Sequence, residues 1–95
     1  MSDWIEVEQD SSPHINRERE KARQLRNSQY WQRLLQKGIC HYCGGRFLPH
    51  ELTMDHIVPL SRGGRSVKGN VAPCCKECNN RKKYKTPVEM ILEDL

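Results

Sequence analysis

The chain has 95 residues, a length that fits one small domain and excludes a large hydrophobic core. Aromatic residues make up only 6% of it, so we expect the fold to need a source of stability beyond apolar burial. The formal net charge is +4, and no stretch approaches the roughly 18 apolar residues that a membrane-spanning helix requires, so no membrane association is expected.

The positive charge is concentrated in the middle of the chain. All sixteen Lys and Arg residues lie between Arg17 and Lys85, where five acidic residues oppose them and leave a net charge of +11. The other seven acidic residues lie at the two ends, and we assign residues 1–13 to an acidic N-terminal arm. A basic middle favours a polyanionic partner, because each neutralised phosphate releases condensed counterions. Charge alone leaves a solvated basic face as an alternative.

Residues 14–37 predict a basic helical segment. Ser12 is the expected N-cap and Pro13 the expected first helical residue. Asn27 and Ser28 offer a second cap, so we expect either one helix broken there or two successive helices. A glycine that follows the amphipathic second half is a suitable terminating residue. The Arg-rich first half has little apolar surface, so we expect it to lie on nucleic acid or a partner and not in the core.

Between residues 38 and 85 the pattern changes to short strands and turns. We expect a short strand within Leu52–Val58 and a brief second strand at Asn70–Ala72. The stretch between them is rich in Gly and Ser and is expected to form a loop.

Two further helices are expected in the C-terminal part. The first is predicted to begin near Cys75 and to continue to Tyr84 or Lys85. The second occupies residues 86–95, where residues 86–89 combine a capping box with a proline at the first helical position. Short strands with flanking helices place the chain in the α+β class.

Four cysteines form two Cys-x-x-Cys pairs, which are separated by about thirty residues: Cys40, Cys43, Cys75 and Cys78. Two chelating pairs of thiolates are the ligand set of a closed tetrahedral site, so we predict a structural zinc ion that joins the two segments. The absence of an N-terminal apolar run favours a reducing, cytoplasmic compartment. Cys74 is expected to be a buried small residue, although it remains an alternative to Cys75 as a ligand. His41 is interpreted as a spacer and not as a fifth ligand.

The two cysteine pairs frame a second ordered set of residues. In chain order the pattern reads Cys-x-x-Cys, Asp-His-x-x-Pro-Leu, Asn and Cys-x-x-Cys-Asn-x-x-Lys, with its non-cysteine members at Asp55, His56, Pro59, Leu60, Asn70, Asn79 and Lys82. Over about residues 38–83 this pattern resembles the zinc-containing HNH nucleases. The resemblance implies two short antiparallel strands and a helix, the ββα-metal motif, which cuts phosphodiester bonds with one divalent cation. We therefore assign residues 38–85 to an HNH nuclease core.

The resemblance also implies roles for individual residues. His56 resembles the general base that takes a proton from the attacking water. Asp55 and Asn79 resemble the ligands of the catalytic cation, for which Mg²⁺ or Mn²⁺ is suited. Asn70 matches the middle residue of the family name and is expected to hold the loop and orient the imidazole. The family name implies His where Asn79 stands, which leaves the preferred metal open.

Charge and position make five residues candidates for phosphate contacts: Arg23, Arg26, Arg62, Arg81 and Lys82. The expected partner is DNA, with RNA left open, and the expected assembly is a monomer or a weak homodimer. One motif offers one active site, so we expect one strand to be nicked at a time. The rival interpretation is a zinc module that only binds nucleic acid and in which the Asp-His pair has no catalytic role.

Overall fold

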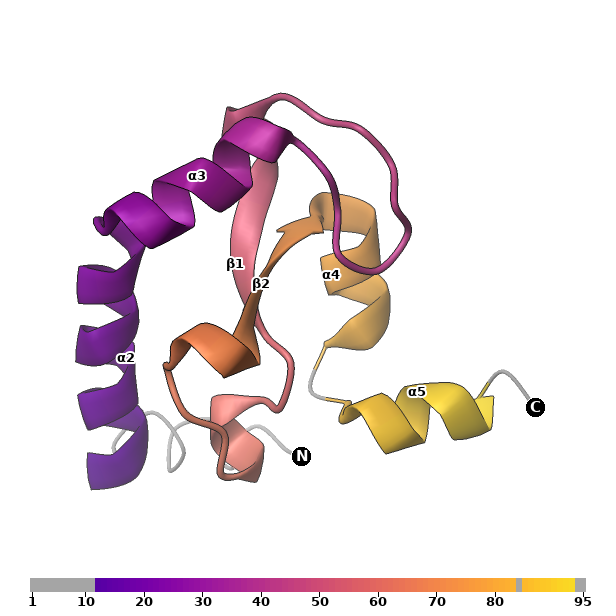
Figure 1. Ribbon diagram of the computed structural model, residues 1–95. Coiled ribbons are helices and arrows are strands. Elements are labelled where there is room, and N and C mark those ends of the chain that lie inside the picture. Colours follow the sequence, from indigo (N-terminus) through magenta and orange to yellow (C-terminus); the bar gives the residue numbers. More distant parts are fainter. Residues whose placement is uncertain (1–11, 84, 94–95) are drawn as a thin grey trace.

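The computed structural model describes residues 12–83 and 85–93, so most of the expected acidic arm, residues 1–11, lies outside the described residues. The described part contains four α-helices and one two-stranded sheet (Figure 1). In chain order its elements are α2 (Pro13–Arg26), α3 (Gln29–Lys37), β1 (Leu52–His56), β2 (Val71–Cys75), α4 (Lys76–Lys82) and α5 (Pro87–Glu93). The expected α+β class is confirmed. None of the described helices is long and apolar enough to cross a membrane.

The first two helices begin and end where the sequence suggested. The hydroxyl of Ser12 accepts a hydrogen bond from the N–H of Ile15 at 3.5 Å, and the hydroxyl of Ser28 accepts one from Trp31 at 3.2 Å. Helix α3 ends at Gly38, whose φ of 68° lies in the left-handed region that favours glycine. The segment therefore forms two separate helices and not one broken helix.

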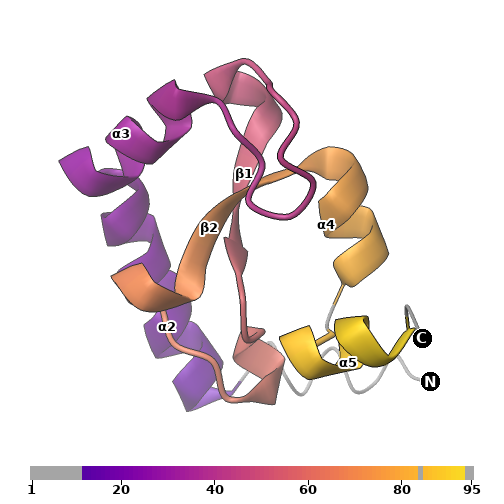
Figure 2. The same ribbon diagram turned by 45° about the vertical axis from the view of Figure 1, so that its right-hand side comes forward.

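Helix α2 packs against the loop between the two strands. Its buried residues are Ile15, Glu18 and Ala22, whose spacing of three and four residues brings them onto one face. Both views show this helix beside η2, the short 3-10 helix Leu60–Arg62 (Figures 1 and 2). The Arg-rich half was expected to lie on nucleic acid or a partner and not in the core, and this needs correction, because one of its faces is buried against the loop.

The two strands pair antiparallel over five residue pairs, with His56 opposite Val71 at one end. Strand β1 ends at His56, before its predicted limit. Beyond His56, a single hydrogen bond from the N–H of Ile57 to the carbonyl of Asn70 at 2.9 Å still joins the two segments, which is too little to extend the strand. Strand β2 begins one residue later than predicted and is longer, since it continues to Cys75. His56 and the start of α4 therefore lie at opposite ends of the sheet.

Helix α4 follows β2 without an intervening loop. It ends at Lys82, earlier than predicted, because Lys83 has a φ of 51° and leaves the helical conformation. Tyr84, one of its predicted limits, lies outside the described residues. Helix α5 has the expected capping box, in which the N–H of Thr86 donates to the carboxylate of Glu89 at 2.9 Å.

The main buried cluster is built around cysteines and not around large apolar side chains. Its buried members, with the partly buried residues that pack on them, are Cys40, Leu52, Cys74, Cys75, Cys78, Leu35, Tyr42 and Phe47. Such a core buries little apolar surface, as the composition predicted. A bound metal ion among the cysteines can supply the stability that this core lacks.

Candidate zinc cluster and active site

The four cysteines of the two Cys-x-x-Cys pairs converge. Cys40 and Cys43 come from the turn after α3, Cys75 ends β2, and Cys78 lies on α4. Their sulfur atoms all lie within 4.8 Å of one another, and those of Cys43 and Cys75 are 4.0 Å apart. A zinc–sulfur bond of about 2.3 Å in a tetrahedron gives sulfur separations of roughly 3.8 Å, so a small contraction would accommodate zinc. The predicted grouping is confirmed.

Backbone amides support this cluster. The N–H of Cys75 donates to the sulfur of Cys40 at 3.4 Å, and the N–H of Cys78 donates to the sulfur of Cys75 at 3.5 Å. Burial opposes ionisation of Cys40, but hydrogen bonds from the backbone of Cys43 and Cys75 outweigh it and lower the pKa of Cys40 to about 6. Burial and the neighbouring cysteines raise the pKa of Cys78 to about 12. Cys78 is therefore protonated beside the ionised Cys40, and a bound cation such as Zn²⁺ would favour its ionisation.

The fifth cysteine and the histidine of the first pair lie outside the cluster. Cys74 is fully buried on β2, and its thiol donates to the carbonyl of Cys75 at 3.4 Å. Burial raises the pKa of the Cys74 thiol to about 12. The ring of His41 packs edge to face on that of Tyr42, with ring centroids 4.9 Å apart. The structure thus groups Cys75, and not Cys74, with the other three ligands.

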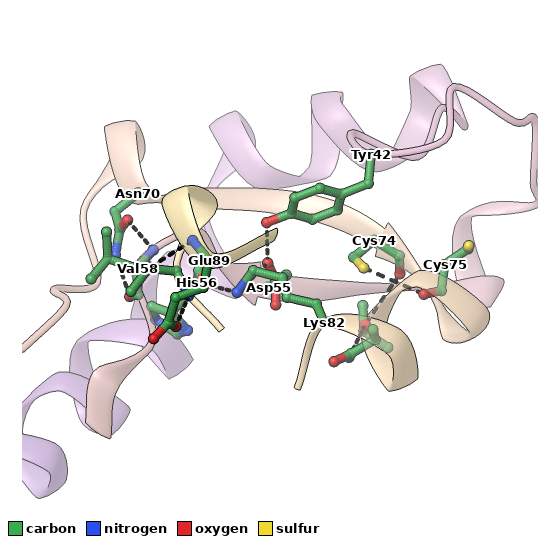
Figure 3. A network of polar contacts seen from close by, with 12 residues as sticks. Tyr42, Asp55, His56, Val58, Asn70, Cys74, Cys75, Lys82 and Glu89 are labelled. Atoms are coloured by element: carbon green, nitrogen blue, oxygen red, sulfur yellow. Dashed lines mark hydrogen bonds and ion pairs between the residues drawn. The ribbon is translucent and has the colours of Figure 1, made fainter. Parts of the chain in front are cut away.

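Asp55 is a buried carboxylate that is contacted from two sides. It is 7% exposed, and its Oδ2 accepts a hydrogen bond from the hydroxyl of Tyr42 at 2.5 Å (Figure 3). The Nζ of Lys82 lies 3.4 Å from the same oxygen. Burial and the Asp55 carboxylate raise the pKa of Tyr42, so its hydroxyl remains a donor. Both contacts involve Oδ2, and Oδ1 makes no hydrogen bond to any described side chain.

Lys82 is directed into the protein. Its side chain is 1% exposed, and its Nζ also donates to the carbonyl of His56 at 2.9 Å (Figure 3). It was expected among the phosphate contacts, but the structure places its charge beside Asp55 instead. The ammonium therefore neutralises a buried carboxylate and ties α4 to the end of β1.

Substitution of Lys82 by Met is expected to destabilise the fold by about 3 kcal/mol, because it leaves the buried carboxylate of Asp55 without its cation. Urea unfolding of the zinc-loaded protein measures this loss. Lys76→Met is the matched control, since Lys76 is exposed on the same helix and should change the free energy of unfolding by less than about 0.5 kcal/mol. Equal losses in the two variants would contradict the role assigned to Lys82.

Asn79 lies one helical turn before Lys82 on α4. Its Nδ2 donates to the hydroxyl of Thr53 at 3.3 Å, and Thr53 shares a face of β1 with Asp55 because side chains alternate along a strand. Asn79 and Asp55 thus face the same side of the layer formed by β1 and α4. No hydrogen bond joins these two side chains, and the amide oxygen of Asn79 has no partner among the described residues.

The imidazole of His56 makes one hydrogen bond to a side chain in the described part of the chain. Its Nε2 lies 2.9 Å from the hydroxyl of Ser66, and its Nδ1 makes no hydrogen bond there. Burial lowers the pKa of His56 below its usual value, and the charges of Arg26 and Lys82 add to this effect against the opposing charge of Asp55. The ring is therefore neutral near pH 7, as a general base must be.

Two residues that the sequence analysis did not assign to the site, Ser66 and Glu18, lie on the Nε2 side of this imidazole. The hydroxyl of Ser66 donates to the backbone carbonyl of Glu18 at 2.5 Å, and the N–H of Ser66 donates to the carboxylate of Glu18 at 2.6 Å. Ser66 lies in a turn-rich loop and Glu18 in a basic helix, so neither carries a local signal. Only the packing of α2 on the loop brings them to His56.

Asn70 holds the loop that follows His56. Its Oδ1 accepts a hydrogen bond from the N–H of Val58 at 2.8 Å (Figure 3). Its Nδ2 donates to the carbonyls of Val58 and Arg65, at 3.1 and 2.8 Å. No hydrogen bond joins its side chain to the imidazole, and its hydrogen bonds act on the backbone of the loop that follows His56.

The two phosphate candidates on α2 lie near its C-terminal end. Arg23 pairs with Glu20 on the exposed side of the helix. Arg26 is exposed, and its charge reaches the imidazole of His56, whose pKa it helps to lower. Of these two candidates, Arg26 is the one that acts on the site electrostatically.

The other two arginine candidates have partners of different kinds. Arg62 forms a bidentate pair with Glu89 of α5, at 3.0 and 3.2 Å. Arg81 donates to the sulfur of Cys78 at 3.7 Å. Arg62 is nearly half exposed, so a phosphate could reach it in exchange for Glu89.

The segment that holds the cysteine cluster, Asp55 and His56 is similar to a known family of proteins. Residues 40–85 match the family model described as HNH endonuclease. This segment is an HNH domain. The resemblance seen in the sequence is confirmed, and the family implies nuclease activity on nucleic acid. No curated protein matches the chain. Helices α2, α3 and α5 lie outside the matched segment.

Proposed function

We propose that this protein is a metal-dependent endonuclease that hydrolyses phosphodiester bonds in DNA. The observation that carries the proposal lies at the end of β1 in the HNH segment, where an imidazole and a carboxylate each retain a free atom. These atoms are Nδ1 of His56 and Oδ1 of Asp55. In this proposal residues 38–85 are the nuclease core, and residues 14–37 and 86–95 are accessory helical segments.

His56 is the proposed general base. Its ring is neutral at pH 7 because burial lowers its pKa, so it can accept a proton from a water molecule beside the scissile phosphate. That water would attack the phosphorus while the bond to the leaving oxygen breaks. Asn70 supports this role indirectly, because it fixes the loop that begins directly after the base.

Asp55 and Asn79 are the proposed ligands of the catalytic cation. Carboxylate and amide oxygens suit Mg²⁺ or Mn²⁺, and each residue has an oxygen without a hydrogen bond to the described side chains. When bound, such a cation polarises the scissile phosphate and stabilises charge on the leaving oxygen. Tyr42 and Lys82 hold the other oxygen of Asp55, and they thereby orient its carboxylate.

The four-cysteine cluster is proposed to bind a structural zinc ion. The four sulfur atoms would fill all positions of a tetrahedral ion and would leave none for substrate. All five cysteines are free thiols, which suits the reducing cytoplasm that we propose for this protein.

Four arginines are proposed to contact DNA phosphates: Arg23, Arg26, Arg62 and Arg81. Arg26 is the most direct candidate, because its charge acts on the imidazole that would lie beside the scissile phosphate. Lys82 is not part of this set, because its ammonium is buried against Asp55. Phosphate contacts carry no information on the base sequence, so we propose that these arginines contribute little to sequence preference.

Incubation of supercoiled plasmid with the zinc-loaded protein tests the proposed function. Cleavage is expected with Mg²⁺ or Mn²⁺ and not with EDTA. The zinc content and circular dichroism of the EDTA sample must match those of the active samples, so that loss of the structural ion is not mistaken for loss of the catalytic one. DNA that is bound but uncut with every cation would support the zinc module without catalysis. RNA of matched length serves as the competing substrate.

We predict that nicked plasmid accumulates before linear plasmid in the same reaction. A monomer with one active site cuts one strand per visit, so a linear product requires two independent events. Gel separation of the three plasmid forms over time, at limiting protein concentration, measures their order of appearance. Linear DNA that forms without a nicked precursor would instead indicate two active sites acting together.

A further inference from the structure

Two residues outside the HNH pattern, Ser66 and Glu18, lie behind the imidazole of His56. The Nε2 of His56 is 2.9 Å from the hydroxyl oxygen of Ser66, which donates to the backbone carbonyl of Glu18 at 2.5 Å. This chain of hydrogen bonds runs from the end of β1 through the loop to α2. It joins the proposed base to a helix that precedes the family-matched segment.

The protons along this chain decide the tautomer of His56. A serine hydroxyl has one proton, and that of Ser66 is directed to the carbonyl of Glu18. Ser66 can therefore only accept a hydrogen bond from His56, so Nε2 must carry the proton of the neutral ring. The unprotonated nitrogen is then Nδ1, which makes no hydrogen bond in the described part of the chain.

Glu18 also holds Ser66 through its side chain. Its carboxylate accepts from the N–H of Ser66 at 2.6 Å and is only 3% exposed, with the ammonium of Lys21 at 3.3 Å. The hydrogen bond from the Ser66 backbone lowers the pKa of Glu18, so the group is ionised at neutral pH. The backbone carbonyl and the carboxylate of one residue thus restrain both the position and the hydroxyl of Ser66.

The loop between the strands is fixed at a second point on the same helix. The Nε2 of His14 lies 2.9 Å from the carbonyl of Gly64. A Cβ atom on Gly64 would lie 1.8 Å from the carbonyl oxygen of Val58, so the loop is closely packed there. Helix α2 therefore contacts the loop at two points, one on each side of residue 65: His14 contacts Gly64, and Glu18 contacts Ser66.

We infer that Ser66 and Glu18 are positioning residues that hold His56 as the Nε2–H tautomer and so present Nδ1 to the attacking water. The kinetic part of this inference rests on the proposed function, whereas the tautomer is a property of the folded protein. The active-site structure then extends beyond the HNH segment to α2, which supplies Glu18.

Nitrogen-15 NMR of the zinc-loaded protein, without a catalytic cation and at about pH 8, reports the protonated ring nitrogen of His56 directly. In the wild type we expect the Nε2–H tautomer. Ser66→Ala removes the acceptor and should move the ring to a mixture of tautomers, while Ser66→Thr keeps a hydroxyl and should retain the wild-type signal. A wild-type ring protonated on Nδ1, or a ring unchanged by Ser66→Ala, would overturn the inference. The wild-type spectrum alone reports the tautomer of His56, so it tests the inference even where a variant folds poorly.

Plasmid cleavage by the same variants tests the kinetic part. Ser66→Ala is expected to lower kcat on the order of 10-fold to 100-fold with KM unchanged, since DNA binding does not involve Ser66. Ser61→Ala is the matched control, because this serine lies in the same loop and has no hydrogen bond in the described residues. Equal kcat values for the two alanine variants would contradict the positioning role. A wild type that binds DNA without cutting it would refute the proposed function, and the NMR result would still decide the tautomer.

Discussion

His56→Ala is expected to abolish plasmid cleavage while the protein still folds and binds DNA. Loss of a general base typically lowers the rate by about 10²- to 10⁴-fold. The fold should survive, because the only hydrogen bond of the ring to a described residue is with the hydroxyl of Ser66, and that hydroxyl keeps its hydrogen bond to the carbonyl of Glu18. DNA affinity should also survive, because a neutral imidazole neutralises no phosphate.

The measurement combines plasmid cleavage with DNA binding in the presence of Ca²⁺, a cation of the same charge and ligand preference. His50→Ala is the matched control, since His50 is an exposed histidine on the 3-10 helix Pro49–Glu51. It should cut at the wild-type rate. Wild-type cleavage by His56→Ala would show that another group is the base. Equal losses of binding and cleavage would instead favour the zinc module, in which His56 belongs to the DNA-binding surface.

The parts of the fold that the sequence predicted depend on local chemistry. Ser12 and Ser28 cap their helices because a hydroxyl reaches an amide three residues ahead, and Gly38 ends α3 because it adopts a positive φ. The grouping of the four cysteines was equally predictable, since each Cys-x-x-Cys pair is itself a local chelating turn. These features need no knowledge of how distant segments pack.

The remaining contacts of the site depend on tertiary packing. Glu18 looked like an acid that stabilises the start of a helix, and Ser66 looked like a turn residue. Tyr42 lies between two zinc ligands, where nothing indicates that its hydroxyl reaches Asp55. Lys82 did carry a usable signal, because its spacing of three residues from Asn79 places both on the face of α4 that meets β1. The structure buries Lys82 on that face against the carboxylate of Asp55.

Removal of zinc is expected to unfold the protein and not merely to inactivate it. Structural zinc sites contribute about 10–16 kcal/mol of apparent binding free energy, which is comparable to the whole stability of a small domain. The main buried cluster of the described residues is built around these cysteines, which join the turn after α3 to β2 and α4. Cys75→Ser should therefore lose its zinc and its helical circular dichroism together, at any concentration of Mg²⁺.

Cys74→Ala is the matched control for that prediction. Cys74 is the neighbour of Cys75 and is equally buried, but its sulfur lies outside the cluster. It should keep one equivalent of zinc and lose only about 1 kcal/mol of stability, as expected for a small buried truncation. Zinc content by mass spectrometry and unfolding by circular dichroism measure both variants. A folded, zinc-loaded Cys75→Ser protein, or loss of zinc from Cys74→Ala, would show that the ligand set is a different one and that the apolar contacts around it stabilise the fold without the metal.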